Sequence, residues 1–346
     1  MIAKINSSNN GHSVATLYIK IKKGVSTMKF GFMFPGYGGQ FVGMAKEFYD
    51  NCRIMQEHFE QAANCLDKNL VKLCFASSES SLSELENAYI SLFLVSLSLQ
   101  DILKEHDIIP SVVAGRDIGE YAALAAVDGI TLPDAVYLLR KYAGLYQELL
   151  DQRKLSGIHV IHIEPETLKK ACLECTNGNN LVTIAAYETD EQTLITGTYE
   201  SINCLKKTIA TLTSIPTTPA EIGGGLHSQL MDNLVKTMKM YLEKVDFKDS
   251  QVPFIASVTG QALTSGDAIR AAIMQQIHAP LQWKKVVDAF SFCDVIVIIG
   301  PSKELQKQFE TAHPDKKVFT VVTLTDINAL LTFAGKEPLV FEHEND

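Results

Sequence analysis

The stretch "AGRDIGEYAAL", residues 114–124, has the outline of a turn that presents a catalytic side chain. An apolar segment precedes the turn, glycines flank it, and the run "EYAALAAV" that follows is typical of a helix. Such a strand–turn–helix arrangement normally exposes a serine or cysteine nucleophile, with glycines keeping the backbone uncrowded. Here Asp117 occupies the tip and Arg116 precedes it. These residues leave three alternatives: a covalent aspartate, an aspartate that activates water, or a site without catalysis.

Two serines elsewhere in the chain fit the role of nucleophile less well. Ser13 lies in "GHS", but no strand precedes it, and the extended stretch "VATLYIKIKKG" follows in place of a helix. Ser228, directly after His227, is interpreted as an ordinary helix residue. Because the motif requires its strand–turn–helix setting, neither serine is predicted to be the nucleophile.

The histidines, cysteines and glycines do not predict a metal or phosphate site. His159 and His162 in "HVIH" would point to opposite faces of a strand, so they cannot share a metal. The pair Cys172 and Cys175 in "CLEC" is a lone CxxC motif, which we interpret as packing or surface cysteines. The glycines of residues 36–39 lack the spacing of a phosphate-binding loop. We therefore expect no bound cofactor.

Charge and cysteine content exclude several classes of protein. The 346 residues carry 31 Lys and Arg against 40 Asp and Glu, a net charge of −9 without a basic cluster. This balance argues against nucleic acid and anionic membranes as main partners. The seven scattered cysteines fit a reducing, cytoplasmic compartment better than a disulfide framework. No segment is long and apolar enough to span a bilayer, and the N-terminal apolar stretch is too short for a signal peptide.

Strands and helices are expected to alternate along most of the chain. "MKFGFMFPG" predicts a first strand from Met28, and residues 108–114 and "DVIVIIG" predict further buried strands. Helices are predicted between them, which is typical of an α/β protein with a mostly parallel sheet covered on both faces. Residues 1–27 are expected to be an N-terminal extension.

The order of elements changes between residues 156 and 222. "GIHVIHIE" predicts a strand, "PETLKKACLECT" a helix, and "LVTIAAYE" with "QTLITGT" a hairpin, before another helix and a last strand. The order βαββαβ is that of a ferredoxin-like unit. We therefore expect a large α/β domain of residues 28–155 and 223–340, with residues 156–222 inserted as a smaller ferredoxin-like subdomain.

Several of these landmarks, in order along the chain, resemble the malonyl-CoA:acyl-carrier-protein transacylase family. The segments that carry the resemblance are "FMFPGYGGQFVGM", "GRDIGEYAAL", "GITLPDAVYLLRKYAG", "GGGLHSQLM", "ASVTG", "QIHAPLQW" and "VIIGPSKELQ". They span about residues 28–340. The resemblance implies an α/β-hydrolase-like large domain with a ferredoxin-like subdomain.

The family resemblance also implies a reaction and its partners. An acyl group would move from a coenzyme A thioester to an enzyme hydroxyl, and then to the phosphopantetheine thiol of an acyl carrier protein. The covalent intermediate divides one difficult transfer into two easier steps. The expected partners are acyl carrier protein and malonyl-CoA or another acyl-CoA, and the chain is expected to be a cytoplasmic monomer of fatty-acid or polyketide synthesis.

The resemblance assigns catalytic roles to five residues. Asp117 stands at the position of the nucleophile, and His227 stands at that of the base. The main-chain carbonyl of Gln276 would orient His227. The backbone N–H groups of Tyr37 and Ile118 would form the oxyanion hole.

The resemblance assigns substrate contacts to four more residues. Arg140 would bind the free carboxylate of malonate, since its planar guanidinium suits a bidentate pair. Leu226 lies where the family tunes acyl selectivity. Arg116 and Tyr89 complete the predicted substrate-binding set. The elbow, Arg140 and His227 are expected to converge on a cleft between the two domains.

The residues that depart from the family pattern cluster where the chemistry would occur. Asp117 replaces a serine, Arg116 a histidine, Tyr37 and Tyr89 glutamines, and Ala279 an asparagine. Three hypotheses follow from this pattern. The protein is an acyltransferase, a thioester hydrolase that uses Asp117 and His227, or a non-catalytic protein that binds carrier protein.

Overall fold

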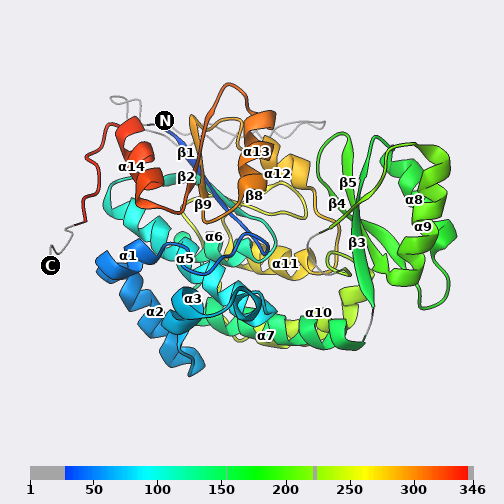
Figure 1. Ribbon diagram of the computed structural model, residues 1–346, viewed down its shortest axis with the longest axis horizontal. Helices are drawn as coiled ribbons and strands as arrows, with labels where there is room; N and C mark the ends of the chain where they lie inside the picture. Colours follow the sequence, from blue (N-terminus) through cyan, green and yellow to red (C-terminus); the bar gives the residue numbers. More distant parts are fainter. Residues whose placement is uncertain (1–27, 153, 221–223, 342–346) are drawn as a thin grey trace, which may run out of the picture.

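The structure is a computed structural model that describes residues 28–152, 154–220 and 224–341. Residues 1–27, which were expected to be an extension, lie outside the described residues, and Ser13 lies among them. Figure 1 shows a central sheet with helices on both sides and a smaller lobe, drawn in green, beside it. The described residues contain no helix that combines the length and the hydrophobicity needed to cross a membrane.

A six-stranded sheet forms the centre of the larger part, in the order β10-β9-β1-β2-β7-β8. Its strands are β1 (Phe30–Phe34), β2 (Pro110–Gly115), β7 (Phe254–Ile255), β8 (Ala262–Leu263), β9 (Val295–Ile299) and β10 (Lys317–Val321). All neighbours pair in parallel except β7 and β8. The predicted α/β class with a mostly parallel sheet is confirmed.

Helices cover both faces of this sheet because its buried strands are apolar on both sides. The helices of this part are α1 (Lys46–Asn51), α2 (Arg53–Leu66), α3 (Leu70–Ala76), α4 (Glu79–Leu82), α5 (Leu85–Glu105), α6 (Gly119–Ala126), α7 (Leu132–Gln152), α10 (Asp232–Leu242), α11 (Gly266–Gln276), α12 (Trp283–Asp288), α13 (Lys303–Ala312) and α14 (Leu324–Phe333). In β1, Phe32 joins the core formed with α5, α6 and α7, while Met33 joins the core formed with α12 and α13. This alternation is the period-2 pattern of a strand with both faces buried.

The small lobe, residues 155–219, has a sheet of its own. Its elements are β3 (Leu155–Ile161), α8 (Pro165–Cys175), β4 (Val182–Tyr187), β5 (Gln192–Thr198), α9 (Tyr199–Leu212) and β6 (Thr218–Pro219). The strands pair antiparallel in the order β4-β5-β3-β6, and α8 and α9 contribute to one apolar core with them. The element order is the βαββαβ order predicted. The division of the chain into two domains at these boundaries stays a prediction.

Backbone hydrogen bonds join the small lobe to the larger part. The Leu281 N–H donates to the Ala185 carbonyl at 2.8 Å, and the Tyr187 N–H donates to the Leu281 carbonyl at 2.9 Å. The end of β4 is therefore fixed to the segment that precedes α12. This junction places the residues that follow β4 next to the elbow.

The interpretation of Cys175 as a packing or surface cysteine is wrong. Cys175 and Cys204 form a disulfide, with their Cα atoms 5.7 Å apart. The two residues are 29 positions apart in the sequence and become neighbours because α8 and α9 lie side by side. Cys172, the other cysteine of the CxxC motif, is buried with a free thiol, and burial raises its pKa to about 12.

Candidate active site

The elbow, residues 115–119, turns the chain sharply from β2 into α6. Asp117 at its tip has a φ of 50°, in the left-handed region. A Cβ atom on Gly119 would lie 2.3 Å from the Phe34 carbonyl oxygen, so only glycine fits there. The Arg116 N–H donates to the same oxygen at 2.8 Å, which fixes the turn on the end of β1. The strand–turn–helix setting expected of a nucleophile position is present.

The carboxyl group of Asp117 is buried and held in place. Asp117 is only 1% exposed. Oδ1 accepts a hydrogen bond from Gln276 Nε2 at 3.1 Å, while Oδ2 is buried without a partner among the described residues. A buried acceptor that lacks a donor costs free energy, so the surrounding fold must hold this arrangement in place. Asp117 is thus positioned by Gln276 and closed off from solvent.

His227 is arranged as a neutral base. Its φ of 58° is unusual for a histidine, and its backbone N–H donates to the Ile277 carbonyl at 3.0 Å. Nδ1 lies 2.7 Å from the Gln276 carbonyl oxygen. Because a carbonyl only accepts, Nδ1 carries the proton and Nε2 is left as an acceptor. Burial lowers the pKa of His227, and this effect outweighs the opposing charge of Asp117.

Gln276 connects the two candidate catalytic residues through both of its polar groups. Its main-chain oxygen orients His227 and its side-chain amide holds Asp117. The first contact lies where the family resemblance places it. The second was not foreseen, because it depends on an aspartate at the tip of the elbow.

A cluster of tyrosine side chains lies close enough to Asp117 to feel its charge. The Tyr89 ring lies 6.2 Å from that of Tyr37 and 6.0 Å from that of Tyr142, and Tyr142 stacks on Tyr146 at 6.3 Å. Burial raises the pKa of Tyr89 and of Tyr142, and the charge of Asp117 raises both further. The hydroxyls of Tyr89 and Tyr142 lack partners within the described structure. Any group attached to residue 117 would have to share this space with the tyrosines.

A cleft of about 770 Å³ lies in front of His227. It is lined by the glycine loop of residues 36–39, by Arg116, Leu226 and His227, by the start of α13 and by the open face of the small-lobe sheet. Asp117 is not among its lining residues. The cleft therefore presents the base and leaves the residue at the nucleophile position behind its wall.

Arg116 faces this cleft but is already paired. Its Nη1 donates to Glu188 Oε2 at 2.9 Å and its Nη2 to Glu188 Oε1 at 2.5 Å. The guanidinium also lies over the indole of Trp283, 4.4 Å from the ring centre. Although burial lowers the pKa of Arg116, the Glu188 carboxylate raises it above the usual value. Arg116 is permanently charged. The face of its guanidinium is covered by Trp283, and its N–H groups are bonded to Glu188.

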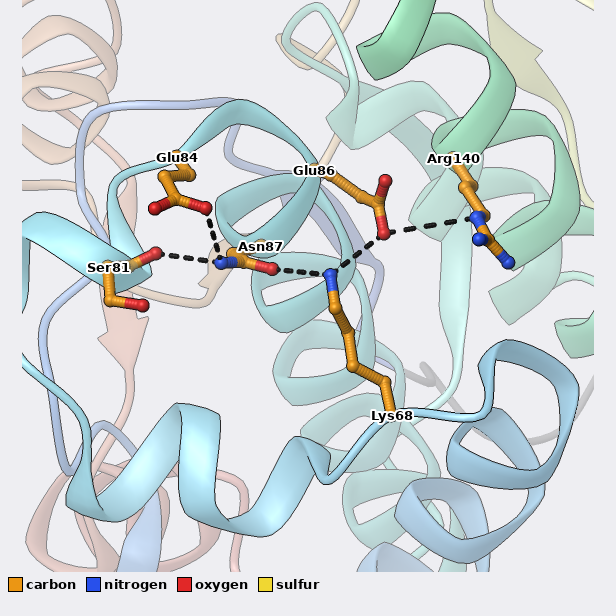
Figure 2. A network of polar contacts seen from close by, with 6 residues as sticks. All are labelled: Lys68, Ser81, Glu84, Glu86, Asn87 and Arg140. Atoms are coloured by element: carbon orange, nitrogen blue, oxygen red, sulfur yellow. Dashed lines mark hydrogen bonds and ion pairs between the residues drawn. The ribbon is translucent and has the colours of Figure 1, made fainter.

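The prediction that Arg140 converges on the cleft is wrong. Its side chain is 50% exposed, and its Nε lies 3.9 Å from Glu86 Oε1. Figure 2 shows Glu86 shared between Arg140 and Lys68, while Lys68 also contacts Asn87. Arg140 borders a separate pocket of about 120 Å³ on the outer side of α7. Helical geometry explains this position, because Tyr142 and Tyr146 of the same helix point into the core.

Tyr37, Ile118, Leu226 and Tyr89 lie at or close to the cleft. Tyr37 and Leu226 line it, Ile118 is the N-cap residue of α6 directly after Asp117, and Tyr89 is buried behind Tyr37. The Tyr37 hydroxyl donates to the Ser83 carbonyl at 2.9 Å. The assignment of the Tyr37 and Ile118 N–H groups to an oxyanion hole stays a prediction.

Sequence reasoning missed Glu188, Trp283 and Tyr142 as parts of this site. Glu188 follows a buried strand and Trp283 begins α12, but nothing local to either residue indicates Arg116 as its partner. Tyr142 does carry a signal, since it falls on the apolar stripe of α7. No cluster of metal-binding side chains occurs in the part of the chain that the structure describes.

Comparison with known proteins adds independent evidence to this geometry. The model of the acyl transferase domain family matches residues 31–323. A malonyl CoA-acyl carrier protein transacylase from Bacillus subtilis is 29% identical over 279 residues, which is 80% of this chain and 88% of the relative.

Two solved structures show the same fold. An acyl carrier protein S-malonyltransferase from Vibrio cholerae has a TM-score of 0.82 at 22% identity, covering 87% of this chain and 99% of the other. A malonyl-transacylase solved with its type II polyketide synthase carrier protein has a TM-score of 0.82 at 23% identity, covering 88% and 99%. The elbow, the buried histidine and the match over most of the length agree, and the chain belongs to the acyl transferase domain family.

Proposed function

We propose that this protein is a malonyl-CoA:acyl-carrier-protein transacylase-like protein of fatty-acid or polyketide synthesis. Its cleft receives the pantetheine thioester that coenzyme A and acyl carrier protein share, and Asp117 makes malonyl transfer very slow. Family membership and the relatives' activity support the substrate class. A cleft of about 770 Å³ has the size typical of a small-molecule site.

The chain retains a base for thiol chemistry at this site. With its proton on Nδ1, His227 can accept a proton at Nε2 from a hydroxyl or thiol that attacks a thioester. Burial keeps the imidazole neutral at physiological pH, so it is ready to act as a base. The main-chain oxygen of Gln276 then stabilises the imidazolium that forms.

The single observation that carries the slow transfer is the burial of Asp117. Its carboxyl group is closed off from the cleft and bonded to Gln276. A carboxylate is a weak nucleophile toward a thioester, and this one is directed to Gln276 and does not line the cleft, so it neither attacks a thioester nor activates water there. The same burial removes the support for a hydrolase that uses Asp117 as its base.

The test replaces the aspartate by the missing hydroxyl. In Asp117→Ser, the serine Oγ attacks the thioester carbon, the C–S bond breaks, and the thiolate of coenzyme A takes the proton held by His227. We expect a malonyl mass adduct on this variant after incubation with malonyl-CoA, and no adduct on the native protein. Asp117→Asn is the matched control, since it keeps the size and hydrogen bond of aspartate without a nucleophile.

Two results would contradict the proposal. If the native protein transfers malonyl at about 1–1000 per second, the usual range for enzymes, Asp117 is a working catalytic residue. If Asp117→Ser binds coenzyme A but forms no adduct, the tyrosines behind the elbow exclude the acyl group as well.

In Asp117→Ser/His227→Ala, adduct formation should fall by about 100-fold or more, because the base is lost.

We further propose that the protein acts as a cytoplasmic monomer with acyl carrier protein as its partner. A relative of the same fold was solved in complex with its carrier protein, which supports this partner class. In a reducing compartment the bond between Cys175 and Cys204 would be open to reduction from outside, since Cys204 is exposed. Pull-down with phosphopantetheinylated carrier protein tests the partner, and light scattering tests the monomer.

A further inference from the structure

The pair formed by Arg116 and Glu188 crosses the cleft between two parts of the molecule. Arg116 belongs to the elbow, and Glu188 follows β4 of the small lobe. Both side chains line the cleft, and they are 18% and 5% exposed respectively. The bidentate geometry is the one that a guanidinium forms with any free carboxylate.

The cleft offers few other cations. Of the described residues that line it, Arg116 and Lys303 carry permanent positive charge, and Lys303 is exposed at the start of α13. Glu304 and the buried Asp117 add negative charge near Arg116. A substrate with its own carboxylate would therefore meet an arginine that is occupied and surroundings that are acidic.

We propose that Arg116 is the carboxylate-binding residue of this cleft and that Glu188 permanently occupies it in place of a substrate carboxylate. The native cleft therefore selects thioesters with an uncharged acyl group over malonyl thioesters. To bind bidentately, a malonyl carboxylate has to displace Glu188 and leave that carboxylate buried without a partner. An uncharged acyl group has no such requirement. This inference rests on the proposed function, because it requires a cleft that receives acyl thioesters.

Calorimetric binding of acetyl-CoA and malonyl-CoA tests this selectivity without depending on turnover. We expect the native protein to bind acetyl-CoA at least about tenfold more tightly, because like charges placed together disfavour the wrong ligand. Glu188→Gln removes the competing charge and should shift the ratio toward malonyl-CoA by about tenfold or more. Glu191→Gln is the matched control, since it removes an exposed carboxylate three residues away, and its ratio should equal the native one.

A second variant guards against loss of folding in Glu188→Gln. Arg116→Met/Glu188→Met removes both charges, which buried pairs often tolerate, and it should bind the two thioesters about equally. The inference is overturned if the native protein binds malonyl-CoA as tightly as acetyl-CoA. It is also overturned if the ratio stays the same in both Glu188 variants. If the native protein binds neither thioester nor coenzyme A, the proposed function fails instead.

Discussion

The two arginines near the elbow and on α7 occupy opposite environments, although the sequence presents both as substrate contacts. Arg116 is largely buried, lies over Trp283, and forms two hydrogen bonds to one carboxylate. Arg140 is half exposed and makes one contact of 3.9 Å with Glu86, which Lys68 shares (Figure 2). An arginine's role therefore follows from the groups that its guanidinium faces, and not from the helix or motif that carries it.

The energetics of the two ion pairs differ for the same reason. Solvent and salt screen an exposed pair, so such pairs contribute about 0–1 kcal/mol. In a buried pair the desolvation of both charges nearly cancels their attraction, but removal of one partner leaves a costly isolated charge. The buried pair therefore mainly fixes the positions of its two side chains. Removal of one partner lowers stability much more than it does in the exposed pair.

The largest effect is expected from Arg116→Met, which isolates the Glu188 carboxylate. The free energy of unfolding should fall by about 3–5 kcal/mol, measured by urea denaturation at pH 7. The double variant Arg116→Met/Glu188→Met should recover most of this loss. A single variant as stable as the native protein would show that the pair is not buried, and the contrast between the arginines would disappear.

The next effect depends on pH and concerns the pKa of Glu120, which lies in α6 directly after the elbow. Burial raises the pKa of Glu120 from near 4.5 to about 8, the Ser257 N–H opposes this, and the charge of Asp117 adds to it. Between these two values the folded state holds a proton that the unfolded state has released, so stability falls as pH rises. The slope is at most about 1.4 kcal/mol per pH unit.

Glu120→Gln should abolish this dependence because an amide does not titrate. Its free energy of unfolding, relative to the native protein, should rise by about 2 kcal/mol from pH 5.5 to pH 7. Urea denaturation across this range measures the difference. Glu86→Gln on the network of Figure 2 is the control, since it replaces a glutamate whose side chain is 32% exposed and leaves Glu120 in place. A flat difference for Glu120→Gln would mean that the Glu120 carboxylate is ionised in the folded state.

The sequence could predict the parts of the site that local patterns encode. The elbow follows from an apolar strand, two glycines and a helix, and the βαββαβ order follows from periodicity. Periodicity also indicates that Arg140 points away from the core, since Leu139, Tyr142 and Tyr146 mark the buried stripe of α7 and Arg140 falls outside it.

The remaining features depend on tertiary contacts that no local pattern carries. Arg116 meets Glu188 only because the Leu281 segment fixes the end of β4 beside the elbow. The disulfide between Cys175 and Cys204 likewise depends on how α8 lies beside α9. Asp117 at the elbow was visible in the sequence, but its burial among tyrosines was not.

A smaller effect separates the hydroxyls of the tyrosine cluster. Tyr142→Phe removes a buried hydroxyl that has no partner in the described structure, so stability should stay the same or rise by up to about 1 kcal/mol. Tyr146→Phe is the matched control, since its hydroxyl donates to the Gly224 carbonyl at 3.0 Å, and stability should fall by about 1 kcal/mol. The opposite order in urea denaturation would show that the Tyr142 hydroxyl is bonded in solution.

The smallest effect is expected from Arg140→Ala, the counterpart of Arg116→Met. Its loss leaves Glu86 paired with Lys68 at 2.8 Å and exposes no buried charge, so the free energy of unfolding should change by no more than about 0.5 kcal/mol. Malonyl-CoA affinity should also stay within about twofold of the native value, because Arg140 lies outside the cleft. Lys68→Ala, on the same network, should behave alike. A tenfold loss of malonyl-CoA binding confined to Arg140→Ala would return this arginine to the site and overturn the contrast with Arg116.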